Sequence, residues 1–383
     1  MRTVATVLVI LLVGASGLPA GAVTAADQQA EGYAGTHVSF ETSNSAIVDY
    51  TVDGETMLQS MAVQSQSSAE SQGEVSAGLS LSAVTELAGS PVALDSKTDV
   101  NAEVTAESGA SMRAHDNSQG ILVVRTGDES QYLTANVSSS AQAESEGDQR
   151  VVVTTEDGTE GAFLVVGDGE VTVNDNGNVS AELGSDGKLV FRSYPDSRDS
   201  EDQQEERSIS EGKAAGEVYV MQTGEQGGEL ATDVVQYSED TAVEVTETSE
   251  GAVTITAERS QEEGKILLTS VSEQAISSTE DLEVTVDGEA AARASSYSEL
   301  ESATDGGDSS KFLVRQQSSA EASADVLVAV NHFSTREITM TEGDGGNENG
   351  TADDETSTGL PGFGVGVALL ALLSVALYAY RRP

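Results

Sequence analysis

Residues 150–194 read RVVVTTEDGTEGAFLVVGDGEVTVNDNGNVSAELGSDGKLVFRSY, a series of short apolar segments separated by turn residues. Four pairs of Asp or Asn followed by Gly recur every eight to eleven residues, at Asp157-Gly158, Asp168-Gly169, Asn176-Gly177 and Asp186-Gly187. Such pairs supply the positive φ angles that tight hairpin turns require. The pattern predicts an antiparallel meander over 150–195, with strands at 162–166, 170–173, 178–183 and 188–194.

The same kind of pattern extends on both sides of this run. Apolar and polar residues alternate at 100–106, 242–246, 252–257 and 282–286, which is typical of half-buried strands. Continuous apolar runs at 121–124, 151–153, 163–166 and 218–221 indicate central strands covered on both faces. The fold class is therefore all-β. Regular hairpin signals favour an extended antiparallel β-sandwich over the alternative β-solenoid, whose fixed 20–30-residue repeat is missing.

Three segments are poor in large apolar side chains, and one pentad occurs twice. Residues 196–207 contain six acids and no apolar side chain, which predicts an exposed loop or a short polar helix near 201–207 with a solvated face. Ser- and Ala-rich stretches at 59–78 and 290–302 predict exposed edge strands or loops. The pentad Thr-Val-Asp-Gly-Glu occurs at 51–55 and again at 285–289, which suggests similar hairpins paired within one sheet.

Charge is distributed unevenly along the 383 residues, which contain 18 Lys+Arg and 65 Asp+Glu. Residues 1–26 and 359–383 contain no acid, so the intervening segment has a formal charge of −50, from 15 basic and 65 acidic residues. High net charge with few aromatic residues is typical of intrinsic disorder. The alternative is a folded protein in multimolar salt, where the Debye length is about 3 Å or less. Strand patterning and the presence of only five lysines favour the folded, halophilic interpretation.

Composition also excludes several classes of partner and site. The negative charge excludes nucleic acid, which needs a basic footprint. The absence of cysteine excludes disulfides and thiolate metal sites. His37, His115 and His332 lie far apart in sequence, and Asn174-Asp-Asn-Gly-Asn178 lacks the ligand spacing of a calcium loop. We therefore expect no resident metal or cofactor, and only weak nonspecific association of Ca²⁺ or Mg²⁺ with the acidic surface.

The N-terminal residues 1–26 have the organisation of a secretory signal peptide. Arg2 precedes an apolar run at 4–13, and both Ala20-Gly21-Ala22 and Val23-Thr24-Ala25 place small residues where signal peptidase cleaves. The apolar run is too short to span a bilayer. It predicts export, with the acidic ectodomain at 27–340 outside the membrane.

The C-terminal residues 359–383 contain 21 uncharged residues at 360–380. As a helix this segment spans the roughly 30 Å hydrocarbon core, because each residue rises about 1.5 Å. Arg381 and Arg382 follow it and predict a cytoplasmic end. Residues 341–358, rich in Gly, Thr and acids, predict a flexible tether between ectodomain and helix.

Pro361-Gly362-Phe363, the apolar segment and the pair Arg381-Arg382 together resemble the tripartite PGF-CTERM sorting signal of archaeal surface proteins. This resemblance implies that an archaeosortase, a membrane cysteine protease, removes the helix near the tripeptide and transfers the new end to a lipid. The mature protein would then have no transmembrane helix, as after GPI-signal processing. A permanent transmembrane anchor is the alternative.

Three sequons, at Asn136-Val-Ser138, Asn178-Val-Ser180 and Asn349-Gly-Thr351, are candidate N-glycosylation sites in an exported protein. No nucleophile elbow, phosphate-binding loop or His-Glu-x-x-His motif occurs, so we expect no enzymatic activity.

Together these features predict a cell-surface protein of a halophilic archaeon, anchored by membrane or lipid on the extracellular face. Its expected role is structural or interactive, with the membrane, an archaeosortase-type enzyme and S-layer or other envelope proteins as partners. A binding module for glycan, solute or divalent cation is the alternative, and an extracellular hydrolase comes third. The ectodomain is long enough for one extended domain or two sub-domains.

Overall fold

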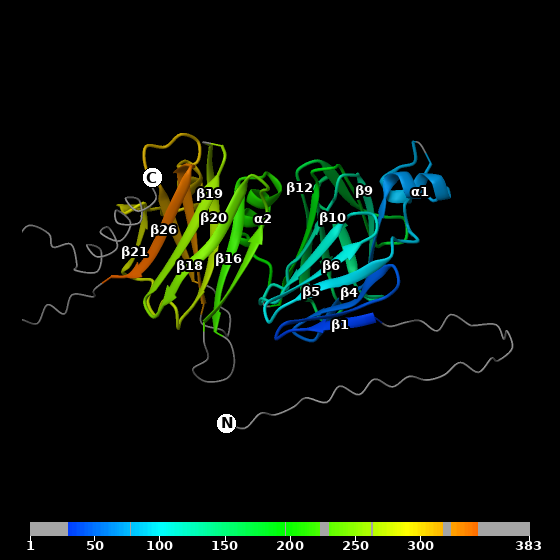
Figure 1. The fold of residues 1–383 in the computed structure, drawn as a ribbon, viewed down its shortest axis with the longest axis horizontal. Helices are drawn as coiled ribbons and strands as arrows, with labels where there is room; N and C mark the ends of the chain where they lie inside the picture. Colours follow the sequence, from blue (N-terminus) through cyan, green and yellow to red (C-terminus); the bar gives the residue numbers. More distant parts are fainter. Residues whose placement is uncertain are drawn as a thin grey trace, which may run out of the picture. The chain divides into compact units, whose positions relative to one another are not determined.

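The computed structural model describes residues 30–343 except 77, 196, 223–229, 262 and 317–322. The predicted signal peptide, nearly all of the tether and the sorting segment lie outside these residues. Strands dominate the described part, forming four sheets, none of them closed (Figure 1). Across the described ranges, no helix has the length and apolar character needed to cross a membrane.

The first and second sheets are built entirely from antiparallel neighbours and contain the N-terminal half of the chain. The first has the strand order β1 (Ala30–Ala34), β2 (Val38–Thr42), β3 (Ala46–Val52), β4 (Glu55–Ser65), β9 (Gln131–Val137), β14 (Val179–Leu183), β13 (Gly169–Val173). The second has the order β10 (Gln142–Ser145), β11 (Arg150–Thr154), β12 (Glu160–Val166), β15 (Lys188–Tyr194), β8 (Leu122–Arg125), β7 (Ser111–His115), β6 (Asn101–Ala106), β5 (Val92–Lys97). They pack face to face as a first sandwich.

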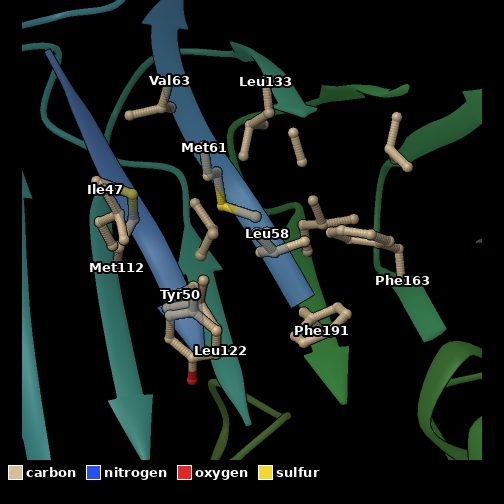
Figure 2. Close-up of a cluster of buried hydrophobic side chains, with 14 of the residues drawn as sticks. Ile47, Tyr50, Leu58, Met61, Val63, Met112, Leu122, Leu133, Phe163 and Phe191 are labelled. Atoms are coloured by element: carbon tan, nitrogen blue, oxygen red, sulfur yellow. The ribbon is translucent and has the colours of Figure 1, made fainter. Parts of the chain in front are cut away.

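The core of the first sandwich contains aromatic side chains from both of its sheets (Figure 2). Tyr50 of β3 meets Phe191 of β15 edge to face, with ring centroids 6.2 Å apart. Phe163 of β12 lies 4.9 Å from Phe191. All three side chains are at most 1% exposed. Burial of each such ring stabilises the fold by about 1.5–3 kcal/mol, so this cluster accounts for much of the cohesion between the two sheets.

The third and fourth sheets form a second sandwich around a separate core. The third has the order β17 (Leu230–Gln236), β16 (Ala214–Gln222), β20 (Glu263–Ser272), β25 (Ser323–His332), β24 (Lys311–Gln316), β23 (Ala292–Arg293). The fourth has the order β18 (Thr241–Ser249), β19 (Ala252–Arg259), β26 (Thr335–Glu342), β21 (Leu282–Val286), β22 (Glu289–Ala290).

The third sheet departs from the purely antiparallel arrangement that the sequence predicts. β16 pairs with β20 in parallel, and β23 pairs with β24 in parallel. After β17 the chain forms the hairpin β18–β19 in the fourth sheet and returns as β20 beside β16. Parallel neighbours require a crossover of this kind. The expectation of an all-β fold is confirmed, whereas the expectation of exclusively antiparallel pairing is wrong.

A third apolar cluster joins the second sheet to the third and explains the continuous apolar runs. In β12, Phe163 and Val165 belong to the first core, whereas Ala162 and Leu164 face this inter-sandwich cluster. Tyr219 of β16 faces it from the other side. Strands covered on both faces have no solvent-facing positions, so their sequences do not alternate.

The predicted strands at 150–194 are present, but their arrangement as one meander is wrong. β11, β12 and β15 lie in the second sheet, while the hairpin β13–β14 pairs with β9 in the first. The turns at Asp157-Gly158 and Asn176-Gly177 close hairpins, whereas Asp168-Gly169 and Asp186-Gly187 carry the chain between sheets. The side chains of β12 and β15 are buried on both faces, so these strands take inner positions in a sheet that is covered on both sides. β13 is half exposed and lies at the edge of the first sheet.

Three further expectations are corrected by the structure. Residues 59–65 are not an exposed edge, because they belong to β4, which lies between β3 and β9. Residues 66–72 form helix α1 (Gln66–Gln72), whose N-cap is Ser65. The repeated pentads do form tight hairpins, with φ of 50° at Asp53 and 53° at Asp287. They lie in the first and fourth sheets, however, because each closes the hairpin local to it.

Candidate functional site: the α2 network and the adjoining recess

Helix α2 (Asp202–Ser210) lies between the two sandwiches and contacts both β12 and β16 (Figure 1). Its start is held by Asp199, whose carboxylate accepts hydrogen bonds from the backbone N–H groups of Glu201 (2.7 Å) and Asp202 (3.0 Å). Ile209, fully buried in the inter-sandwich cluster, anchors the other end. The helix therefore forms where the chain passes from the first sandwich to the second.

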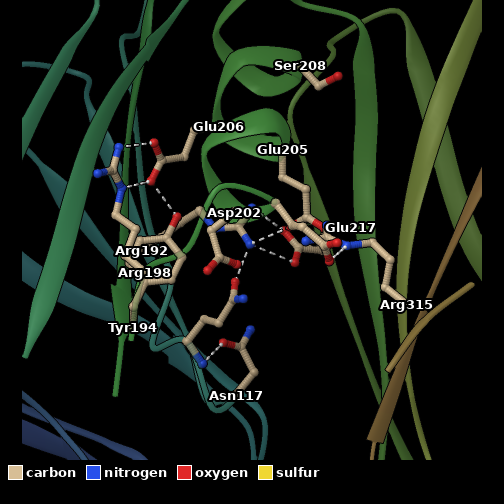
Figure 3. A network of polar contacts seen from close by, with 12 residues as sticks. Asn117, Arg192, Tyr194, Arg198, Asp202, Glu205, Glu206, Ser208, Glu217 and Arg315 are labelled. Atoms are coloured by element: carbon tan, nitrogen blue, oxygen red, sulfur yellow. Dashed lines mark hydrogen bonds and ion pairs between the residues drawn. The ribbon is translucent and has the colours of Figure 1, made fainter. Parts of the chain in front are cut away.

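The short polar helix predicted near 201–207 is present as α2, and Glu201 and Arg207 are exposed, but the solvated face expected for this segment is wrong at Glu205 and Glu206. Glu205 is only 5% exposed and Glu206 is fully buried. The reason is that neighbouring strands and loops supply arginines to these carboxylates, as Figure 3 shows. We call this set of buried charges the α2 network, defined by Arg192, Arg198, Glu205, Glu206, Glu217 and Arg315 with the tyrosines that bond to them.

Glu206 is the first centre of the α2 network. Arg198 donates to its two carboxylate oxygens from Nε (2.6 Å) and Nη2 (2.7 Å). The hydroxyl of Tyr194 donates to Oε1 at 2.8 Å, and Arg150 Nη1 donates to Oε2 at 3.3 Å. A bidentate arginine and a tyrosine satisfy both oxygens of this buried carboxylate, which keeps the helix attached to the first sandwich.

Glu217 of β16 is the second centre and joins the sandwiches directly. Arg192 of β15, which is fully buried, places Nη1 3.1 Å from Oε2 of Glu217. Tyr219 and Tyr237 donate their hydroxyls to the two oxygens of Glu217, each at 2.6 Å. Burial, followed by the charge of Glu217, raises the pKa of both tyrosines well above 10, so they remain protonated donors.

Glu205 lies between two arginines of different sandwiches. Arg192 Nη2 approaches its Oε2 at 3.4 Å, and Arg315 of β24 donates from Nη1 to its Oε1. Arg315 also donates from Nε to Glu201 at 2.6 Å. Burial nevertheless raises the pKa of Glu205 to about 8, and the two arginines oppose this effect only in part.

The raised pKa of Glu205 makes stability depend on pH in a defined direction. Its ordinary pKa is 4.5, so between pH 4.5 and 8 the folded state binds more of this proton than the unfolded state. Stability should therefore fall as pH rises through that window, by at most about 1.4 kcal/mol per pH unit. Urea unfolding in molar KCl at pH 5, 6.5 and 8 measures the slope. Glu205→Gln should flatten it, and Glu258→Gln, an exposed control, should not; equal slopes in all three proteins would contradict the assignment.

Two further buried contacts hold the second and third sheets together. His115 of β7 lies 2.9 Å from Asp233 of β17 through Nδ1, and both side chains are at most 3% exposed. Lys188 of β15 donates to the carbonyl oxygen of Tyr237 at 2.8 Å. These contacts and the α2 network oppose hinge motion between the sandwiches, because separating them would leave several charged groups unpaired in an apolar interface.

The three histidines do not come together. His37 is paired with Asp53, His115 with Asp233, and His332 ends β25. Within the described ranges, no group of three or more His, Asp or Glu side chains has an arrangement that could hold a metal ion.

A recess of about 620 Å³, the α2 recess, opens beside the network. Its walls come from α2, from helix α3 (Tyr297–Glu301) and from β24. Arg315 lines it together with Arg293, Gln204, Thr279 and Leu313. The hydroxyl of Tyr297 hydrogen-bonds to Ser208, which ties α3 to α2 and fixes the shape of the recess.

Two of the candidate glycosylation sites, Asn136 and Asn178, are not among the residues that line this recess. Asn136, in β9, donates from Nδ2 to Ser60 at 2.9 Å. Asn178, before β14, accepts the backbone N–H of Val137 at 3.2 Å. Asn349, Pro361, Gly362, Phe363, Arg381 and Arg382 lie outside the described residues.

Comparison with known proteins finds a family motif in the C-terminal segment. Residues 360–382 match the PGF-CTERM motif. The chain carries a PGF-CTERM sorting signal. The resemblance predicted from Pro361-Gly362-Phe363 is thus confirmed, and the motif is that of archaeosortase-processed, membrane-anchored cell-surface proteins.

The matched motif covers residues 360–382 and no part of the ectodomain. No curated protein matches the chain. A solved structure described as "Heparinase III-BT4657 gene product" aligns at 11% identity with a TM-score of 0.27, covering 61% of this chain and 41% of that chain. A likeness this low carries no argument about fold or activity.

Proposed function

We propose that this PGF-CTERM protein is exported by a halophilic archaeon, anchored to membrane or lipid on the extracellular face, and serves a structural or interaction role in the envelope. The motif at 360–382 is the observation that carries this proposal. The proposal assigns no enzymatic activity and no resident cofactor. Its partners are the membrane, an archaeosortase-type enzyme and S-layer or other envelope proteins.

The organisation of the described residues supports a rigid module. Two sandwiches share an apolar cluster and a charge network, and both would have to be broken for one sandwich to move against the other. A module of this kind maintains a set distance between its anchored end and the surface it presents, which suits a spacer or scaffold.

A second candidate function is a surface binding module, which the α2 recess favours. Its volume lies within the roughly 300–1,000 Å³ typical of small-molecule sites. Polar residues of α2, β23 and α3 line it together with the half-buried Leu313 and Val314 of β24. Scaffold and binding roles are compatible within one anchored protein.

Processing at the tripeptide tests the principal proposal. In a halophilic archaeal host, we expect the protein in the envelope fraction, with mass spectrometry showing loss of the residues that follow the tripeptide. Simultaneous replacement of Pro361, Gly362 and Phe363 by Ala should leave the chain unprocessed. Leu370→Ala, within the apolar segment, is the control and should be processed normally. Recovery of intact chain from the cytosol, or normal cleavage without the tripeptide, would refute the proposal.

A further inference from the structure

The α2 recess contains two arginines whose surroundings differ. Arg315 has carboxylate partners, because its Nε and Nη1 donate to Glu201 and Glu205. Among the described residues, the side chain of Arg293 makes one hydrogen bond, from Nη1 to the carbonyl oxygen of Glu280 at 2.9 Å. Throughout the described ranges no carboxylate lies within 4.0 Å of Arg293, so its Nε and Nη2 remain available to a ligand.

An arginine without a carboxylate is unexpected in a chain with 65 acids and 18 bases. Two other arginines that reach solvent are paired with acids: the exposed Arg113 pairs with Glu103 at 2.5 Å, and the half-buried Arg336 pairs with Asp287. Two other arginines of the described residues lack such a pair. Arg125 is held by the carbonyl of Gln236, and Arg207 lies in the last turn of α2, where a positive charge favours the helix dipole.

The guanidinium of Arg293 is held in place by its neighbours. Its central carbon lies 5.9 Å from the centroid of the Phe312 ring, and Phe312 is only 4% exposed. A guanidinium that lies over a buried ring and is bonded through Nη1 loses less freedom when it binds a ligand. The side formed by Nε and Nη2 matches a carboxylate or sulfate, which arginine binds through two parallel hydrogen bonds.

The rest of the lining fits a polyol. Gln204 and Thr279 supply an amide and a hydroxyl, and Glu201 and Glu280 supply carboxylate oxygens that accept from hydroxyl groups. Leu313 and Val314, which face opposite sides of β24, add aliphatic surface for carbon-bound hydrogens. The lining contains two arginines and two glutamates, so its formal charge is zero.

We propose that the α2 recess binds a sugar-sized polyol that carries one carboxylate or sulfate group, with Arg293 binding the oxyanion. This inference rests on the proposed function in one respect: the surface location supplies the ligand, an acidic sugar exposed in the envelope. The recess and its chemistry do not depend on how the chain is anchored.

Calorimetric titration of the purified protein in molar KCl tests this proposal, with glucuronic acid, glucose 6-sulfate and glucose as probes. We expect at least one acidic sugar to bind, and glucose to bind about tenfold more weakly or not at all. Arg293→Gln should weaken binding of the acid about tenfold or more, because a hydrogen-bonded ion pair is lost. The affinity of Arg293→Lys for the acid should lie between those of the unmodified protein and of Arg293→Gln, since lysine keeps the charge but loses the second hydrogen bond.

Arg113→Gln is the matched control, because it removes an exposed arginine of the first sandwich and should leave binding unchanged. Circular dichroism confirms that each variant is folded. Preference for glucuronic acid or for the sulfate identifies the oxyanion, and either supports the proposal. Glucose binding as tightly as the acids, full affinity in Arg293→Gln, or no binding of either acid to the folded protein would overturn it. None of these results depends on processing at Pro361, so the two proposals fail separately.

Discussion

Transfer of the purified protein from molar KCl to dilute buffer should abolish its β-type circular dichroism. The segment between the two acid-free ends has a formal charge of −50. At 0.1 M salt the Debye length is about 10 Å, so each surface carboxylate repels several of its neighbours. At 1 M salt the Debye length is about 3 Å, and this repulsion is largely screened. Self-repulsion of this size destabilises the compact state. We therefore expect a cooperative loss of structure as salt is removed and its recovery when salt is restored.

A variant in which three exposed acids are neutralised separates charge screening from other effects of salt. Glu244, Glu247 and Glu250 are exposed on and just after the edge strand β18. Their simultaneous replacement by Gln removes three charges and little volume, and should shift the unfolding midpoint to lower salt. A spectrum that is the same in dilute buffer and in molar KCl would remove the case for halophilic adaptation. An unchanged midpoint in the variant would show that repulsion is not the cause.

Arg192→Met should destabilise the protein by about 3–5 kcal/mol. Arg192 is fully buried and contacts both Glu217, at 3.1 Å, and Glu205, at 3.4 Å. Removing one member of a buried ion pair leaves the remaining charge without compensation, which costs far more than the net value of the intact pair. Urea unfolding at constant molar KCl measures the loss.

Two comparisons make this result specific. Arg113→Met breaks an exposed pair with Glu103 and should cost no more than about 1 kcal/mol. Adding Glu217→Gln to Arg192→Met removes the stranded charge while leaving an oxygen acceptor for Tyr219 or Tyr237. The double variant should therefore recover part of the lost stability. A cost for Arg192→Met as small as that for Arg113→Met would show that the α2 network does not hold the sandwiches together.

The strands were predictable because side-chain alternation is a local property. In 252–257 and 282–286 apolar residues recur at every second position, and both segments form strands of the fourth sheet. Which strand pairs with which was not predictable. β12 and β15 pair around the intervening hairpin β13–β14, which itself pairs with β9. Alternation shows which residues face a core, but it does not identify the strand on the neighbouring side.

The buried charges were missed for a related reason. Residues 196–207 have a composition that indicates a solvated surface, yet Glu205 and Glu206 are buried. A signal existed in the strands, where Arg192 and Glu217 interrupt otherwise apolar runs. A lone charge at such a position indicates a buried partner, but the partner's identity depends on the packing of the second sheet against the third.

By itself the sequence determined the β-rich architecture, the separation of charge between the ends and the middle, and the sorting signal, since each depends on the order of neighbouring residues. Only the tertiary structure decided which strands share a sheet, that two sandwiches enclose α2, and that Arg293, beside a recess, has no carboxylate partner among the described residues. Those features arise from contacts between segments distant in the chain, where packing selects one among many pairings that the same local pattern permits.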